Sequence, residues 1–301
     1  MPSLKSHLVA LYLKYTRKRA FASAESIRTW AEWARARSTH RPPDTVRESM
    51  RITEREVDDI PVYEVEPPTL KSGLHIIYLH GGAYLFEITS YHWRLIAEMA
   101  ERLGARVTVP IYRLAPDHTF PAIFGPVHTV CSEILRRDAP EKVVFMGDSA
   151  GGNMAVVLTM MAAEQGLPIP GHHVLISPGL DMSLKNPALY EVEKLDPWLG
   201  IEGGKEAIRL FAPGMETTDW RISPIFGDLS VLPRTLILSG TRDVLSPDTV
   251  IFVEKARAAG VDIELMLEPG MIHVWPLIDM PEARRARDRI VAFLNETELA
   301  D

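Results

Sequence analysis

The sequence predicts an α/β protein with a mainly parallel sheet and helices on both of its faces. From residue 74 onward, short apolar runs of strand length alternate with segments of helix length. Within this series, the β-branched run 143–145 meets a glycine-rich turn at 147–152, and a helix that is apolar on every side is expected over 153–163. This strand, turn and helix form the centre around which the other elements are arranged.

The composition is ordinary for a soluble globular protein, with 46% hydrophobic and 24% charged residues among 301. The net charge of -7 gives no reason to expect nucleic-acid binding. A single cysteine, Cys131, excludes an internal disulfide and a cysteine-based zinc site. We expect Cys131 on the apolar side of a helix, buried in the core. The run 8–13 is too short for the core of a signal peptide, and no run has membrane-spanning length. We therefore expect a cytoplasmic protein.

The first 40 residues are expected to be helical and basic, with eight Lys and Arg against two Glu. Pro42-Pro43 ends this arm, because proline cannot continue a helix. The segments 49–57 and 60–66 alternate polar and apolar residues, which is typical of two antiparallel strands.

The elements of the main body follow in a regular series. Further strands are expected at 74–79, 106–112, 143–145, 173–176, 235–238 and 262–267. Helices are expected at 91–103, 120–136, 153–163, 204–211, 247–259 and 281–294. The segment 179–231 interrupts the series with scattered proline, glycine and tryptophan, so we expect it to form a cap together with the basic arm.

The turn at 147–152 contains the pattern G-x-S-x-G, which places a serine between a strand and a helix. A serine in strained backbone geometry can project its hydroxyl only if its neighbours lack bulky side chains. Gly147 and Gly151 supply that room around Ser149. The pattern therefore predicts Ser149 as a nucleophile.

A serine nucleophile needs a general base, which in this kind of sheet follows it in the chain at the carboxyl end of a later strand. After Ser149 the histidines are His172, His173 and His273. The first two begin a strand and so lie at the opposite end of the sheet. His273 directly follows the last strand and is the predicted base.

The base needs an orienting acid, and two aspartates compete for that role. Asp243 comes directly after the strand at 235–238, at the carboxyl end. Asp248 lies beside Pro247 at the start of a helix, where a carboxylate interacts favourably with the helix dipole. The position of Asp243 favours it as the acid.

Acyl transfer also needs N–H donors that stabilise the developing oxyanion. The segment His80-Gly81-Gly82-Ala83 follows the strand at 74–79, and glycines bring backbone N–H groups close to a ligand. The N–H of Ala150, at the start of the next helix, is a further donor. We therefore expect an oxyanion hole from Gly81, Gly82 and Ala150.

Five features together resemble the hormone-sensitive-lipase-like esterases (bacterial family IV) of the α/β-hydrolase superfamily. They are H-G-G-A at His80, Y-R-L-A-P-D at 112–117, G-D-S-A-G-G-N at Gly147, the Asp243 loop and His273. The resemblance covers about residues 74–295.

The resemblance implies an α/β-hydrolase fold with an eight-stranded, mostly parallel sheet. It implies a cap segment at 1–45 and a catalytic domain at 46–301 with a cap insertion within 179–231. The site that it implies is a Ser149–His273–Asp243 triad with an oxyanion hole from Gly81, Gly82 and Ala150.

Two positions depart from the family pattern. Ala83 replaces the usual third glycine, and we expect the hole to survive because its donors lie upstream. Asp117 replaces the usual glutamate and keeps a carboxylate, one methylene shorter, in a supporting role.

The expected function is that of a serine carboxylesterase that hydrolyses short- to medium-chain esters through an acyl-enzyme, without cofactor or metal. The same triad would serve an amidase, a lactonase or an N-acetyl hydrolase. A ligand-binding relative is disfavoured, because plant gibberellin receptors resemble this family but lack the histidine that His273 supplies here. A dinucleotide fold is disfavoured because Ser149 stands where its fingerprint needs glycine. The expected partner is a small-molecule ester, and a homodimer stays open.

The pocket walls and the arm are predicted less directly. Candidate wall residues are Tyr84, Phe86, Trp198, Trp220, Trp275 and Leu277. For the arm, one role is a cap whose apolar residues Leu8, Leu11, Trp30 and Trp33 close over the Ser149 pocket. The other is contact with an anionic membrane. The cap is favoured, because a soluble monomer needs those apolar residues covered.

Overall fold

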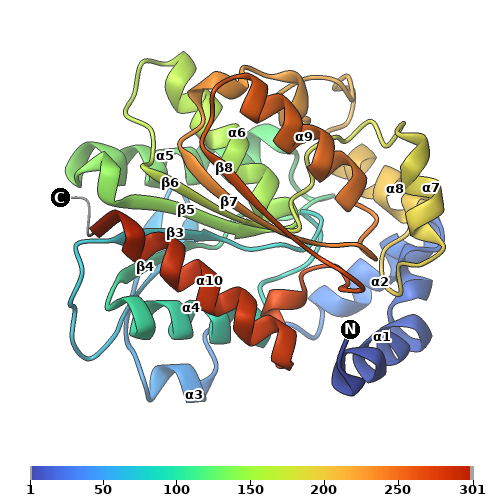
Figure 1. Ribbon diagram of the computed structural model, residues 1–301, viewed down its shortest axis with the longest axis horizontal. Coiled ribbons are helices and arrows are strands. Elements are labelled where there is room, and N and C mark those ends of the chain that lie inside the picture. Colours follow the sequence, from blue (N-terminus) through green and yellow to red (C-terminus); the bar gives the residue numbers. More distant parts are fainter. Residues whose placement is uncertain (1, 299–301) are drawn as a thin grey trace.

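A single eight-stranded sheet runs through the computed structural model, which describes residues 2–298 (Figure 1). The strands in chain order are β1 (Arg51–Val57), β2 (Ile60–Glu66), β3 (His75–Leu79), β4 (Arg106–Pro110), β5 (Val143–Asp148), β6 (His172–Ile176), β7 (Arg234–Gly240) and β8 (Ile263–Glu268). Their order across the sheet is β1-β2-β4-β3-β5-β6-β7-β8. The predicted eight-stranded sheet is confirmed.

The sheet is antiparallel only at its first edge, where β1 pairs with β2 and β2 with β4. All later pairs are parallel, so their carboxyl ends meet at one edge of the sheet. In the register of β3 and β5, Leu79 lies opposite Gly147. The loop after β3 and the turn after β5 are therefore neighbours.

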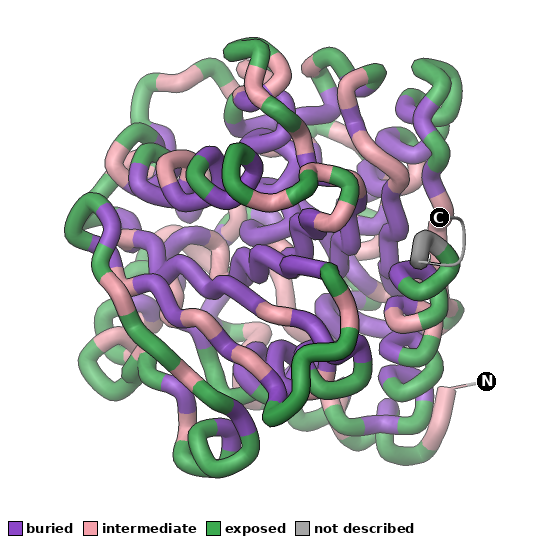
Figure 2. Tube along the Cα trace, turned by 90° about the vertical axis from the view of Figure 1, so that its left-hand side faces the viewer, coloured by how far each residue is buried: buried purple, intermediate pink, exposed green. Residues whose placement is uncertain are grey.

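Helices cover both faces of the sheet (Figure 1). One face carries α4 (Ser90–Leu103) and α10 (Pro281–Glu298), and the other carries α5 (Phe120–Arg137), α6 (Ala150–Glu164) and α9 (Ser246–Ala258). Figure 2 shows the buried part of the trace concentrated in the strands and the inward sides of these helices. Cys131 is buried in α5, as predicted, and burial raises the pKa of its thiol.

In helix α4, the residue His92 both caps the helix and contacts Asp148 at the end of the central strand β5. Thr89 begins it with a capping box, in which His92 Nδ1 accepts a hydrogen bond from the Thr89 backbone N–H at 2.9 Å. Because Nδ1 is an acceptor, Nε2 carries the proton and lies 3.3 Å from Asp148 Oδ2. Gly104 ends the helix at φ 59°, where a glycine avoids strain.

Two groups of helices lie beyond the carboxyl edge of the sheet. The first contains α1 (Leu4–Thr16), the 3₁₀ turn η1 (Lys18–Phe21) and α2 (Ala24–Arg35), and the second contains α7 (Pro187–Glu193) and α8 (Ile201–Phe211). The two groups touch closely, because a Cβ on Gly203 would lie 2.6 Å from Phe21 Cα. Arg28 Nε and Glu206 Oε1 join them with an ion pair of 2.5 Å.

For the eight strands and the long helices, the predicted boundaries agree with the structure to within a few residues. Short elements in irregular sequence were not predicted: α3 (Asp44–Arg47), α7 and the 3₁₀ turns η2 (Pro140–Lys142), η3 (Pro224–Phe226), η4 (Leu229–Val231) and η5 (Trp275–Leu277). Within residues 2–298, no helix has the length and apolar character needed to cross a membrane. The described part of the chain also holds no group of three or more His, Cys, Asp or Glu side chains suited to a metal ion.

Candidate active site

Ser149 lies in the turn between β5 and α6 with φ 52°, in the left-handed region that a serine rarely adopts. The glycines on either side allow this turn. A Cβ on Gly147 would lie 2.5 Å from the Gly151 carbonyl oxygen, and one on Gly151 would lie 1.9 Å from the carbonyl oxygen of Leu79. The crowding around the turn is the steric condition that the sequence pattern predicted.

The structure brings together the three side chains predicted for the triad. Ser149 Oγ lies 3.0 Å from His273 Nε2, and His273 Nδ1 lies 3.0 Å from Asp243 Oδ2. They follow β5, β8 and β7 at the carboxyl edge of the sheet. Asp243 is fully buried, and its second oxygen accepts a hydrogen bond from the Leu245 N–H at 3.0 Å. Because His273 donates Nδ1–H to a carboxylate, its Nε2 is left to accept the serine proton.

The histidine is surrounded by carboxylates. Burial alone would lower the pKa of His273. The Asp243 carboxylate at Nδ1 outweighs burial and raises that pKa above its ordinary value of 6.5, and the charges of Asp196 and Asp148 add to this effect. These carboxylates therefore favour the imidazolium form of His273.

The competing candidates lie elsewhere. Asp248 is buried at the start of α9, where its Oδ1 accepts a hydrogen bond from Asn186 Nδ2 at 2.7 Å. His172 and His173 are at the amino-terminal end of β6, the end away from Ser149.

The loop after β3 is held against the turn by Asp148. Gly81 donates its N–H to Asp148 Oδ1 at 3.0 Å, and the Tyr78 hydroxyl donates to the same oxygen at 2.8 Å. Burial alone would raise the pKa of Asp148, but the neighbouring His92 and the hydrogen bonds from its Nε2–H, the Tyr78 hydroxyl and the Gly81 N–H together lower that pKa, so the acceptor is a carboxylate. Gly81 therefore differs from the expectation, because its N–H is already taken by Asp148 and is not free for an oxyanion.

Three other backbone N–H groups at this point are free. Among residues 2–298, the N–H groups of Gly82, Ala83 and Ala150 have no hydrogen-bond acceptor. All three residues line the same cavity as Ser149. Gly82 has φ 125°, and Ala83 has φ 54° although it is not a glycine. The replacement of the usual third glycine by Ala83 thus leaves an unpaired donor in a left-handed backbone.

The cavity above Ser149 has a volume of about 810 Å³ and a mainly apolar lining. Both segments that were expected to form a cap contribute walls, with Phe21 and Trp30 from the arm and Met182 and Leu199 from the segment 179–231. Four of the predicted wall residues line it: Tyr84, Phe86, Trp198 and Leu277. The other two pack elsewhere in the core: Trp220 and Trp275.

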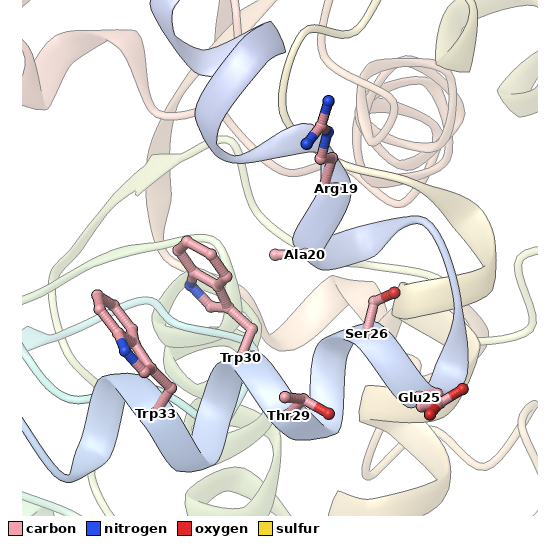
Figure 3. A pocket seen from close by; sticks show the side chains of 7 residues that line it. All are labelled: Arg19, Ala20, Glu25, Ser26, Thr29, Trp30 and Trp33. Carbon is pink, nitrogen blue, oxygen red and sulfur yellow. The ribbon is translucent and has the colours of Figure 1, made fainter.

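An outer groove of about 450 Å³ lies beside this cavity, between η1 and α2 (Figure 3). Ala20, Trp30 and Trp33 line both the groove and the cavity. In Figure 3 the two indoles rise side by side from α2, and their ring centroids are 5.2 Å apart. The indoles therefore form part of the boundary between the two hollows.

Residues 76–277 match a family model described as the alpha/beta hydrolase fold. An esterase of Acinetobacter venetianus is 31% identical over 228 residues, which cover 74% of this chain and 75% of that protein. The chain belongs to the hormone-sensitive-lipase-like esterases of the α/β-hydrolase family.

Further relatives agree with this assignment. Carboxylesterase NlhH of Mycobacterium tuberculosis is 30% identical over 279 residues, which cover 87% of each chain. A crystal structure of an esterase from the bacterial hormone-sensitive lipase family superposes with a TM-score of 0.84 at 26% identity and covers 99% of each chain. The predicted family and fold are confirmed.

In this esterase, the motif at 112–117 supports the site from behind. The Tyr112 ring stacks on His80 at 4.1 Å between centroids, and its hydroxyl donates to the His80 carbonyl oxygen at 2.6 Å. Burial lowers the pKa of His80 to about 3, so this histidine is neutral. Asp117 pairs with Arg35 Nη1 of α2 at 2.8 Å. The motif thus connects the loop after β3 to the arm.

The structure adds one residue that the sequence analysis missed. Asp196, in the loop between α7 and α8, is 3% exposed. Its Oδ1 accepts from the Trp198 and Leu199 N–H groups at 2.7 and 2.9 Å, and its Oδ2 accepts from the Val244 N–H at 2.9 Å. Burial, together with the nearby Asp243 charge, raises the pKa of Asp196 to about 6. Asp196 therefore ties the loop between α7 and α8 to the loop that carries Asp243.

In Asp196→Asn an amide nitrogen replaces one carboxylate oxygen and cannot accept the hydrogen bond from the Val244 N–H. Because this removes one hydrogen bond to a charged group, we expect kcat/KM to fall roughly tenfold. In the native enzyme, kcat/KM should rise with pH through the pKa of His273, above 6.5, because only the neutral imidazole accepts a proton. Loss of the Asp196 charge should move this rise to lower pH.

The measurement is the pH profile of kcat/KM on a soluble p-nitrophenyl ester. Asp181→Asn is the matched control, because Asp181 lines the same cavity and the hydrogen bond that its carboxylate makes in the described part of the chain is local, from the Ser183 N–H. An equal shift of the profile in both variants would contradict a specific effect of Asp196.

Proposed function

We propose that this carboxylic ester hydrolase uses Ser149 as nucleophile, His273 as general base and Asp243 as the acid that orients the histidine. The relay of two 3.0 Å contacts, opening into an apolar cavity, carries this proposal. Ser149 Oγ attacks the ester carbonyl carbon while His273 takes the serine proton. The proton then passes to the leaving alkoxide, and an acyl-enzyme remains. Water, deprotonated by His273, hydrolyses it and restores the serine.

The oxyanion of each tetrahedral intermediate would be held by the N–H groups of Gly82, Ala83 and Ala150. These donors are unpaired among the described residues, and they line the cavity beside Ser149. Gly81 is given a positioning role, because its N–H is bonded to Asp148. Ala150 also begins α6, where the helix dipole favours negative charge.

The domain organisation supported by these contacts is a cap over a catalytic body. The cap comprises the segment 1–45 and the insertion within 179–231, and the body comprises the rest of 46–301. The support is that both cap segments line the cavity and that α2 joins α8 through Arg28 and Glu206.

The substrate class proposed is the short- to medium-chain carboxylic ester. Turnover of p-nitrophenyl esters of rising acyl length, with an amide and a lactone of matched acyl size, tests this. We expect the esters to be hydrolysed faster than the amide, because p-nitrophenolate leaves more easily than an amine, and turnover to fall for the longest acyl groups. A higher kcat/KM on the amide or the lactone would instead support the alternative functions.

A further inference from the structure

Helix α1 carries apolar residues on both of its faces, but the body covers only one of them. Ala10 and Leu13 face inward and are buried. The outward residues follow one another at helical spacing and remain exposed: Leu4 at 78%, Leu8 at 58%, Leu11 at 52%, Tyr12 at 60% and Tyr15 at 68%. We call these five residues the outer stripe.

The outer stripe corrects part of the expectation for the arm. Leu8, Trp30 and Trp33 do line the catalytic cavity, as a cap requires. Leu11 points outward instead, with about half of its surface exposed. The arm therefore lines the cavity with one side and leaves a second apolar side without cover in the part of the chain that the structure describes. Figure 1 shows α1 on the outside of the molecule, beyond the sheet.

The arm that carries the outer stripe also carries unpaired positive charge. The first 40 residues carry +6, so the remaining chain carries -13 to reach -7. Some cations of the arm are neutralised by the body, such as Lys5 by Asp279 and Arg35 by Asp117. Within residues 2–298, four others make no ion pair with a carboxylate: Lys14, Arg17, Arg19 and Arg37.

The outer stripe is also continuous with the catalytic cavity. Leu8 and Tyr12 belong to the stripe and line the cavity at the same time. Arg17 and Arg37 line the cavity as well. The guanidinium carbon of Arg17 lies 5.3 Å from the ring centroid of Trp30, and that of Arg37 lies 4.8 Å from the ring centroid of Trp33. The access to Ser149 is thus bordered by apolar, aromatic and cationic groups, the mixture found where proteins lie in the headgroup region of a bilayer.

We propose that α1 docks this esterase on an anionic lipid surface, with the outer stripe in the interface and the cavity mouth turned toward the lipid. The apolar side chains would leave water, and the unpaired cations would meet anionic headgroups. The more negative body would be repelled by the same surface, which sets the orientation. The docking does not depend on the proposed catalytic mechanism; it would bring amphiphilic esters to the cavity.

A second copy of the chain fits this face less well. A two-fold contact through the outer stripe would place two arms of +6 against each other and close the cavity mouth of both copies. An anionic lipid surface has the complementary charge.

Co-sedimentation with vesicles tests the proposal. The native chain should bind vesicles of phosphatidylcholine mixed with phosphatidylglycerol, bind phosphatidylcholine vesicles at least about tenfold more weakly, and lose affinity as salt is raised. The triple variant Leu4→Ser, Leu11→Ser, Tyr15→Ser should bind the mixed vesicles on the order of 100-fold more weakly. None of these three residues lines the cavity, so turnover of a soluble short ester should stay native.

The matched control is the triple variant Leu70→Ser, Ile251→Ser, Leu267→Ser, which removes three exposed apolar residues that lie outside α1. It should bind like the native chain. Equal loss in both triple variants, or a native chain that stays in the supernatant, would overturn the proposal. So would a dimer, seen by light scattering, that dissociates only in the α1 variant. Because binding is measured without turnover, it can be repeated with Ser149→Ala, and failure of docking is separable from failure of the mechanism.

Discussion

Replacing Ser149 with alanine is expected to lower the turnover of p-nitrophenyl esters by on the order of 10⁴-fold or more. The hydroxyl lies 3.0 Å from His273 Nε2, and no acyl-enzyme forms without it. The fold should survive, because alanine keeps the Cβ that the turn already holds at φ 52°. The measurement is kcat on a short ester with the purified variant, together with its thermal unfolding midpoint.

Ser132→Ala is the matched control for this substitution. Ser132 is also a buried serine, in α5, but it does not line the cavity. Its loss should leave kcat close to the native value. Ser149→Ala protein that retains more than a tenth of native turnover, in a preparation that unfolds as the native chain does, would sink the proposed mechanism.

Much of the fold could be predicted because burial on both faces leaves a direct signal in the sequence. The strands β3 and β5 are buried at every position, so they read as continuous apolar runs. Helix α7 was missed because it is seven residues long and only Leu189 is buried. A single buried position gives no periodicity to detect.

The proximity of Ser149, His273 and Asp243 was predictable for a topological reason. In a parallel sheet the carboxyl ends of strands share one edge, so a serine, an acid and a histidine that each follow a strand must approach one another. The role of Gly81 was not predictable in this way. Its N–H is taken by Asp148, and that hydrogen bond depends on the register between β3 and β5.

The role of Asp196 and the exposure of the outer stripe could not be predicted from the sequence, for a different reason. The Asp196 carboxylate accepts hydrogen bonds from the N–H groups two and three residues later in the chain, those of Trp198 and Leu199. This local turn pattern is common in loops. Its third bond, to Val244, joins segments 48 residues apart. The apolar residues of α1 were visible, but which of its two apolar faces the body covers is decided by tertiary packing.

Asp243→Asn is expected to lower kcat by on the order of 10⁴-fold while leaving the fold intact. The Leu245 N–H bonds to Asp243 Oδ1 and would select the asparagine oxygen at that position. The amide NH₂ would then face His273 Nδ1, where Oδ2 now lies at 3.0 Å. An NH₂ there favours the tautomer protonated on Nε2, which cannot accept the proton of Ser149. Single-turnover acylation measured at the pH optimum tests this expectation.

Asp248→Asn is the control that separates the two candidate acids. Burial raises the pKa of Asp248 to about 6, so the folded chain loses stability as this carboxyl ionises between its ordinary 3.8 and about 6. The asparagine variant should lack that pH dependence in its unfolding midpoint, and the bond from Asn186 can persist because asparagine keeps an acceptor oxygen. Its kcat should stay close to native, since Asp248 does not contact His273. The reverse pattern, with acylation lost in Asp248→Asn and kept in Asp243→Asn, would transfer the role of the acid to Asp248.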